Sequence, residues 1–154
     1  MPITIHINKK YAGLKFSPRR LQKLIKDLCR HFHLCRAVIE IEIVGDSAIR
    51  KLNRKFLANP RITDCISFNL SEKTLKLFQI VVNAQMAKRE AKKRNNPQQA
   101  ELALYVLHGL LHNLGFNDNN KKNADIMHKT EDRFLQEIGC GIVYNKTKKE
   151  KKHK

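Results

Sequence analysis

The chain has 154 residues, of which 42% are hydrophobic and 29% are charged, as in an ordinary globular protein of one domain. Lysine and arginine outnumber aspartate and glutamate by 31 to 14, which gives a formal net charge of +17. No apolar run reaches the roughly 18–20 residues that span a bilayer, and no secretory signal is visible at the start. The four scattered cysteines form no CxxC pair, so we expect a cytoplasmic protein.

The basic excess predicts a polyanionic partner. The last nine residues, KTKKEKKHK, hold six lysines and one glutamate, so they contribute +5 and leave +12 on the rest of the chain. An excess of this size attracts nucleic acid through phosphate contacts. A membrane surface is the weaker alternative, because no helix joins a basic face to exposed tryptophan or phenylalanine anchors. We expect a folded domain over residues 1–145 and a basic, disordered tail over residues 146–154.

The first third of the chain predicts a strand, a helix and a second strand. Apolar and polar residues alternate over residues 3–8, as in a half-buried strand. Ser17 and Pro18 then form a typical helix start, and leucines and isoleucines at helical spacing predict an amphipathic helix over residues 18–33. Isoleucines alternate with glutamates over residues 38–44, which predicts the second strand.

The middle third predicts a short helix, a loop and two further strands. Gly45 and Asp46 indicate a turn, and the following residues predict a short helix whose apolar face carries Ile49, Leu52 and Phe56. Residues 57–64 contain a proline and little periodicity, so we expect a loop. The apolar runs CISF at 65–68 and QIVV at 79–82 predict strands.

The last third predicts three helices. Asn83 is placed to cap a helix that runs to about Arg94, before an Asn-Asn-Pro break. Residues 98–114 are apolar almost all round, as in a central buried helix, and Gly115 is placed to end it. A final helix, closed by Gly139, places on one stripe Ile126, Met127, Thr130, Phe134 and Ile138.

No internal repeat is visible, and the order of elements predicts an α+β fold. We expect a single domain with a roughly four-stranded mixed sheet and four or five helices. The most apolar helix, which carries a pair of histidines, is expected at its centre.

The histidine pair lies in the segment VLHGLLHNLGFND, residues 106–118. His108 and His112 are four residues apart, so a helix projects both from one face, about one turn apart. Gly115 allows the chain to turn back and to return Asp118 towards them. Two imidazoles and one carboxylate leave a fourth position for water, the pattern of a catalytic zinc. We therefore expect zinc on His108, His112 and Asp118, with a zinc-bound water in the attack.

An ordinary core role is the alternative for these histidines, since an HxxxH pair often arises by chance. Two unpartnered histidines on so apolar a helix would each cost a few kcal/mol, whereas one shared ion accounts for both. Zinc peptidases carry a glutamate directly after the first histidine, where this chain has Gly109. Peptidase chemistry is therefore disfavoured, and the basic exterior favours a phosphodiester substrate.

A second cluster, CRHFHLC at residues 29–35, also suggests metal binding. Its cysteines and histidines point in different directions from the end of a helix, so they cannot converge on one ion. We interpret this segment as structural.

Residues 106–118 resemble the signature of the YbeY family of bacterial endoribonucleases, which reads H-G-x-L-H-x-x-G-aromatic-D-H. The residues that match it are His108, Gly109, Leu111, His112, Gly115 and Phe116. LN at 52–53 and TDCISF at 63–68 resemble the family's L-N and T-[DN]-V-L-S-F. The residues that match its closing helix are Met127, Glu131, Leu135 and Gly139. The resemblance covers nearly the whole chain except the lysine-rich tail.

The resemblance implies a single-strand-specific, metal-dependent endoribonuclease that acts in rRNA 3′-end maturation, particularly of the small subunit, and in ribosome quality control. It implies one zinc ion per chain, rRNA and the small ribosomal subunit as partners, and neither a membrane nor a small-molecule cofactor. The family holds zinc with three histidines. His108 and His112 take two of these positions and Asp118 takes the third; His128 is a more distant alternative ligand.

The chain departs from the family pattern at two further places. Leu57 stands where the family carries an arginine that is important for RNA, and Phe78-Gln79 replaces a Gly-Asp pair. The side chains expected to contact RNA instead are Arg54, Lys55, Arg61, Thr63 and Ser67. The facing wall of the cleft is expected to contain Thr63, Asp64, Ser67 and Phe68.

Three interpretations stay open at this point. Glu131 can support a zinc-binding histidine, or it can serve at the surface or in helix packing. The whole chain can be an assembly factor that binds rRNA or the ribosome and retains a metal site with little nuclease activity. It can also be a zinc hydrolase of a small substrate.

Overall fold

The structure, a computed structural model, describes residues 3–58 and 61–137. Its elements in chain order are β1 (Ile3–Lys9), α1 (Pro18–His31), β2 (Ala37–Val44), α2 (Asp46–Leu57), β3 (Cys65–Asn69), β4 (Lys76–Asn83), α3 (Ala84–Arg94), α4 (Gln98–Asn113) and α5 (Lys121–Glu137). The expected domain boundary at residue 145, the tail 146–154 and the predicted helix end at Ile138 and Gly139 lie outside the described residues.

The four strands form one mixed sheet in the order β1-β2-β4-β3. Strands β1, β2 and β4 are parallel, and β3 pairs antiparallel with β4 at the edge. Because side chains alternate along a strand, Ile39, Ile41 and Ile43 all point to one face, where they are buried. The predicted α+β class, with a four-stranded mixed sheet and five helices, is confirmed.

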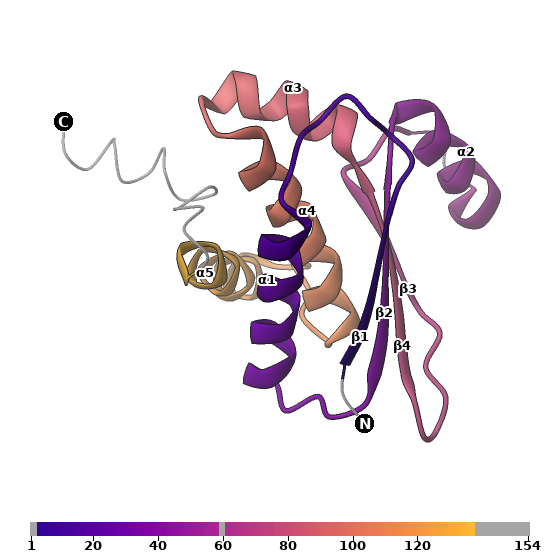
Figure 1. Cartoon of the computed structure of the whole chain (residues 1–154), viewed down its shortest axis with the longest axis vertical. Helices are drawn as coiled ribbons and strands as arrows, with labels where there is room; N and C mark the ends of the chain where they lie inside the picture. The colour runs from indigo at the N-terminus through magenta and orange to yellow at the C-terminus, as the bar shows by residue number, and fades with distance from the viewer. Residues whose placement is uncertain (1–2, 59–60, 138–154) are drawn as a thin grey trace, which may run out of the picture.

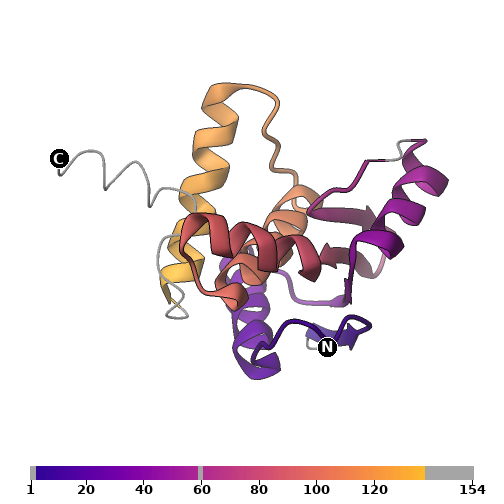
Figure 2. The ribbon, with the colours of Figure 1, turned by 90° about the horizontal axis from the view of Figure 1, so that it is seen from above.

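Helices cover the two faces of the sheet unequally. Helices α1 and α4 pack on one face with α5 outside them, and α2 lies on the other face (Figure 1). Seen from above, α2 and α5 lie on opposite sides of the molecule (Figure 2). No helix of the described residues is both long enough and apolar enough to cross a membrane.

Helix α4 is the central helix, as predicted. All its residues from Ala100 to Leu107 are buried. Gly109 lets the helix approach the sheet closely, because a Cβ atom there would lie 2.7 Å from Cγ2 of Ile80. The histidine pair therefore belongs to a helix that is buried along most of its length and lies close against the sheet.

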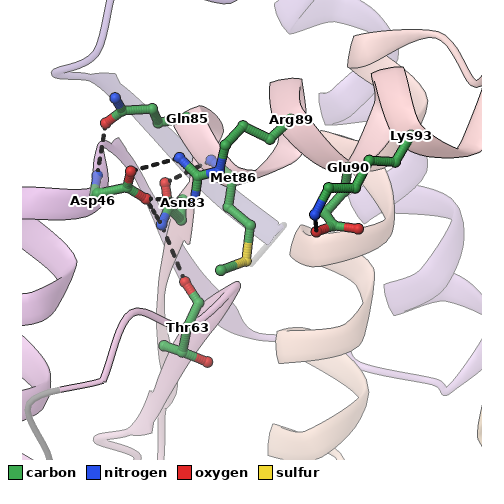
Figure 3. Close-up of polar contacts among 8 residues, drawn as sticks. All are labelled: Asp46, Thr63, Asn83, Gln85, Met86, Arg89, Glu90 and Lys93. Atoms are coloured by element: carbon green, nitrogen blue, oxygen red, sulfur yellow. Dashed lines mark hydrogen bonds and ion pairs between the residues drawn. The ribbon is translucent and has the colours of Figure 1, made fainter.

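A polar cluster joins α2, α3 and the loop before β3 (Figure 3). Asp46, the first residue of α2, accepts hydrogen bonds from Arg89 at 2.6 and 3.0 Å and from Nδ2 of Asn83 at 2.8 Å. Nδ2 of Asn83 also donates to the carbonyl of Thr63 at 3.2 Å, while its Oδ1 caps α3 by accepting from the backbone of Met86. This Asp46 cluster fixes the start of both helices and the position of Thr63.

The structure corrects several details of the predicted helices. The helix predicted over 18–33 ends at His31, because Phe32 caps it and His33 takes a positive φ of 57°. Gly45 and Asp46 form no separate turn, since Gly45 is the N-cap of α2. The Phe56 side chain, predicted to face inwards, is exposed at the end of α2, which also exposes four basic side chains. The expectation that no helix joins a basic face to an exposed phenylalanine is therefore wrong for α2.

The buried stripe of α5 also differs from the prediction. Met127 and Phe134 are buried as expected, but Ile126 is exposed. The stripe is completed by Glu131 and Leu135. Glu131 is buried in place of an apolar residue because its carboxylate contacts the histidine pair.

Candidate metal centre

His108 and His112 project from the last turns of α4. The helix ends at Asn113, and Gly115 follows with a positive φ of 101°, which turns the chain back. This turn returns Asp118 to the histidines, so that one ring nitrogen of each histidine and one carboxylate oxygen of Asp118 all lie within 4.8 Å of one another. The structure thus brings together the three residues that the sequence singled out as ligands.

A hydrogen bond fixes the orientation of each imidazole ring. Nδ1 of His108 donates to Oε2 of Glu131 at 2.7 Å, and Nδ1 of His112 donates to the carbonyl oxygen of Phe116 at 3.2 Å. A carboxylate and a carbonyl can only accept, so each Nδ1 carries its ring's proton. In both rings Nε2 is therefore the nitrogen with the free lone pair.

The two Nε2 atoms face each other at 3.0 Å, with the rings nearly perpendicular. Two lone pairs at this distance repel unless a cation lies against both of them. Imidazole nitrogen with its second nitrogen anchored, together with a carboxylate oxygen, is a donor set that zinc prefers. The residues present therefore fit a zinc ion held by His108, His112 and Asp118.

Local charge also favours a cation here. Burial by itself would lower the pKa of His108, but the hydrogen bond that the ring donates to Glu131 and the charge of that carboxylate outweigh burial and raise it. Asp64 and Asp118 act in the same direction. The field that favours a proton on His108 favours a divalent ion at its Nε2 for the same reason.

Glu131 is the residue whose role the sequence left open. Its side chain is only 1% exposed, and its two oxygens accept from two rings: Oε2 from His108, and Oε1 from Nδ1 of His128 at 2.8 Å. The surface role considered for Glu131 is therefore wrong. His128 is not part of the three-residue group but joins it through this carboxylate. The spacing of three residues between His128 and Glu131 on one helix is the sequence signal that could have found this contact.

A surface pocket of about 430 Å³ opens beside the histidine pair. His108, His128 and Glu131 form one side, and Thr63 and Asp64 lie in its wall as predicted. The residues that complete it come mainly from α3 and α4: Ile62, Met86, Glu90, Arg94, Leu104 and Tyr105. The pocket lining contains three carboxylates and one arginine, and the arginine, Arg94, is paired with Glu90.

Other predicted contact residues lie away from this pocket. Ser67 does not line it, and Phe68 packs with the cluster between α2 and the sheet, because neighbouring strand residues point to opposite faces. Arg54 and Lys55 are exposed on α2, and Arg61 is exposed in the loop before β3. The predicted RNA contacts of these residues stay predictions.

The cysteines of the described part of the chain contribute no ligand to the histidine pair. Desolvation, followed by the nearby charges of Asp64 and Glu131, raises the pKa of the Cys65 thiol, which keeps it protonated. The cysteines and histidines of residues 29–35 are not brought together around one point. Their structural interpretation agrees with the packing of His31 edge-on against Phe134.

Known proteins resemble the chain over most of its length. A sequence profile described as "Endoribonuclease YbeY" matches residues 6–139. Two proteins named Endoribonuclease YbeY, from Persephonella marina and Syntrophus aciditrophicus, are 26% and 31% identical to it; the alignments cover 87% and 88% of this chain and 92% and 89% of theirs. The solution structure of TM1509 from Thermotoga maritima superposes with a TM-score of 0.60 at 26% identity, covering 87% of this chain and 91% of that one. The chain belongs to the Endoribonuclease YbeY family.

Proposed function

We propose that this protein is a zinc-dependent endoribonuclease that cleaves single-stranded RNA. The observation that carries the proposal is the pair of facing Nε2 atoms, 3.0 Å apart, within reach of the Asp118 carboxylate. His108, His112 and Asp118 would hold the ion. Bound there, zinc supplies Lewis acidity, which polarises a phosphoryl oxygen and activates water for attack on phosphorus.

The chain's own residues contribute orientation and protons. Glu131 holds the Nδ1 proton of His108, so in the neutral ring Nε2 carries the lone pair and faces His112. The carbonyl of Phe116 does the same for His112. The net charge of +17 draws an RNA strand to the surface.

The family relationship supports a more specific role. We propose that the substrate is ribosomal RNA, that cleavage matures the 3′ end of the small-subunit RNA, and that the protein also acts in ribosome quality control in the cytoplasm. The small ribosomal subunit is then the partner. We further propose that residues 1–145 form the catalytic domain and that residues 146–154 are a basic extension of it.

Metal analysis combined with RNA cleavage tests the proposal. Purified wild-type protein should contain about one zinc ion per chain, and His112→Ala should lose most of it. Cleavage of an unstructured single-stranded RNA should stop with a chelator. It should fall by more than about 100-fold in His108→Ala, since even loss of an outer partner of a ligand typically costs 10–100-fold. His6→Ala, at an exposed histidine on β1, is the matched control and should change neither.

A second candidate is an rRNA-binding assembly factor with little nuclease activity. It is favoured by Leu57, which is 57% exposed where the family pattern has an arginine, and by Asp118 in the place of a third histidine. Zinc in the wild-type protein with RNA left intact under all metals tested would select this candidate. Equal zinc in wild type and His112→Ala would defeat the metal site itself.

A further inference from the structure

An aromatic pair with one exposed ring lies on the α2 side of the sheet. The Phe56 side chain is 53% exposed, and its ring meets the ring of Phe68 edge to face, with centroids 5.5 Å apart. Phe68 belongs to the edge strand β3 and packs against the cluster of buried residues between α2 and the sheet. Phe56 is therefore held by a fixed neighbour while much of its ring meets solvent. Flat, fixed and exposed rings are the surfaces on which unpaired nucleobases stack.

The helix that carries Phe56 is strongly basic. Arg50, Lys51, Arg54 and Lys55 are exposed on α2, and none of the four forms a salt bridge with another described residue. Nζ of Lys55 lies 5.2 Å from the centroid of the Phe56 ring. The only acidic residue of α2, Asp46, is already paired with Arg89. Unpaired cations around an exposed aromatic ring are the combination with which proteins bind single-stranded nucleic acid.

The aromatic pair adjoins the candidate metal centre across strand β3. Asn113, the residue after His112, donates from Nδ2 to the carbonyl of Phe68 at 3.5 Å. Because strand residues alternate, Ser67 faces α4 while Phe68 faces α2. An RNA strand that crosses the free edge of β3 therefore passes from the histidine pair directly to the aromatic pair.

The distribution of charge favours an RNA path over α2 rather than a path into the pocket beside the histidines. The pocket is lined by the carboxylates of Asp64, Glu90 and Glu131, with Arg94 as its arginine. Arg94 is already paired with Glu90 and Glu101, so the pocket offers a phosphate no unpaired arginine, whereas α2 offers four exposed cations that form no salt bridge with another described residue. The strand that flanks the cleaved bond should therefore lie over α2.

We propose, on the basis of the proposed function, that Phe56 and Phe68 form a stacking platform for an unpaired base of the RNA substrate. Arg54 and Lys55 hold the adjoining phosphates. The platform binds single-stranded RNA of any sequence, because every base offers a π face.

Binding of a fluorescein-labelled, unstructured single-stranded RNA of about 12 nucleotides, measured by anisotropy with the full chain, tests the platform. Phe56→Ala should weaken binding by about tenfold, while Phe56→Tyr, which keeps the ring, should bind like wild type. Leu57→Ala is the matched control, because Leu57 is a neighbouring and similarly exposed apolar side chain without a π face. It should change affinity by less than about twofold. A 2-aminopurine base in the RNA should lose its stacking-dependent quenching in Phe56→Ala.

Two other outcomes would overturn the platform. Equal losses in Phe56→Ala and Leu57→Ala would indicate a general apolar surface for a protein partner. An unchanged affinity in Phe56→Ala, together with losses in Arg54→Gln and Lys55→Gln, would indicate purely electrostatic binding.

Failure of the platform and failure of the proposed function give different results. Metal content should be unchanged in Phe56→Ala, because Phe56 is not one of the three candidate ligands. If the platform proposal is wrong, Phe56→Ala leaves the RNA affinity unchanged, and chelator-sensitive cleavage persists. If the proposed function fails, cleavage is absent while the binding difference between Phe56→Ala and Leu57→Ala remains.

Discussion

Helices α4 and α2 pack on opposite faces of one sheet and are built in opposite ways. Helix α4 is buried along most of its length and carries two polar rings at one end. Helix α2 buries only Ile49 and Asn53, and it exposes four basic side chains. The difference suits the two proposed roles: the proposed metal site needs fixed donors, which a buried helix supplies, and the proposed RNA platform needs accessible charge, which a peripheral helix supplies.

The sharpest test of this contrast is to add a side chain to each helix. Gly109→Val on α4 would push against Ile80, which is fully buried and cannot move aside. We expect a loss of about 2–3 kcal/mol in the free energy of unfolding, or a melting temperature lower by about 5–10 °C. Ala48→Val, at an exposed position of α2, should cost no more than about 0.5 kcal/mol. Similar shifts in both variants would show that α4 is not packed more tightly than α2.

A smaller effect is expected where α4 meets α5. Glu131→Gln keeps one oxygen acceptor but removes the charge, so the two rings that Glu131 now holds can no longer both be satisfied. Zinc affinity, measured by competition with a chelating dye, should fall by about 10- to 100-fold. Glu137→Gln, at an exposed glutamate of the same helix, is the control. Unaltered zinc affinity in Glu131→Gln would remove this glutamate from the support of His108.

The smallest effect concerns the Asp46 cluster, which fixes the start of α2. The hydrogen bond from Arg89 is the main cause that lowers the pKa of Asp46. A carboxylate with a lowered pKa stabilises the folded protein above its unfolded pKa of about 3.9, and this contribution is lost as the pH falls through the folded pKa.

Arg89→Gln should therefore cost about 0.5–1 kcal/mol at neutral pH, a small value because both side chains are partly exposed to solvent. In urea unfolding, the difference from wild type should shrink as the pH is lowered towards 3. Lys92→Gln, at an exposed lysine of the same helix, is the control. If the unfolding free energies of Arg89→Gln and wild type differ by the same amount at neutral pH and at low pH, the ionisation of Asp46 does not couple α2 to α3.

The sequence was most informative where periodicity and burial coincide. Alternation predicted Ile39, Ile41 and Ile43 as a buried strand face, and the apolar character of α4 predicted its central place. The four-residue spacing of the histidines and the glycine after them were enough to bring Asp118 into the group. These are local rules, so a single chain reveals them.

Features that depend on contacts between distant elements could not be predicted in this way. Phe56 follows the same spacing as Ile49 and Leu52, but it lies near the end of α2, where its ring meets Phe68 of the edge strand and stays 53% exposed. Glu131 was ambiguous because a glutamate at a buried helical position becomes favourable only when two rings from other positions meet it. Ser67 and Phe68 were both expected in the wall of the cleft, but neighbouring strand residues point to opposite faces, and which of them faces the histidines depends on the order of the strands.

The hydrogen bond between His108 and Glu131 has a thermodynamic consequence, because it is a joint between two helices as well as a support for a ligand. An ion that binds more tightly when this hydrogen bond is formed must, by linkage, also stabilise the hydrogen bond. The gain in ion affinity and the gain in the attachment of α5 to α4 are equal in free energy. Substitutions on the inner side of α5, far from any ligand atom, should then alter ion uptake. Conversely, ion uptake should slow hydrogen exchange along α5.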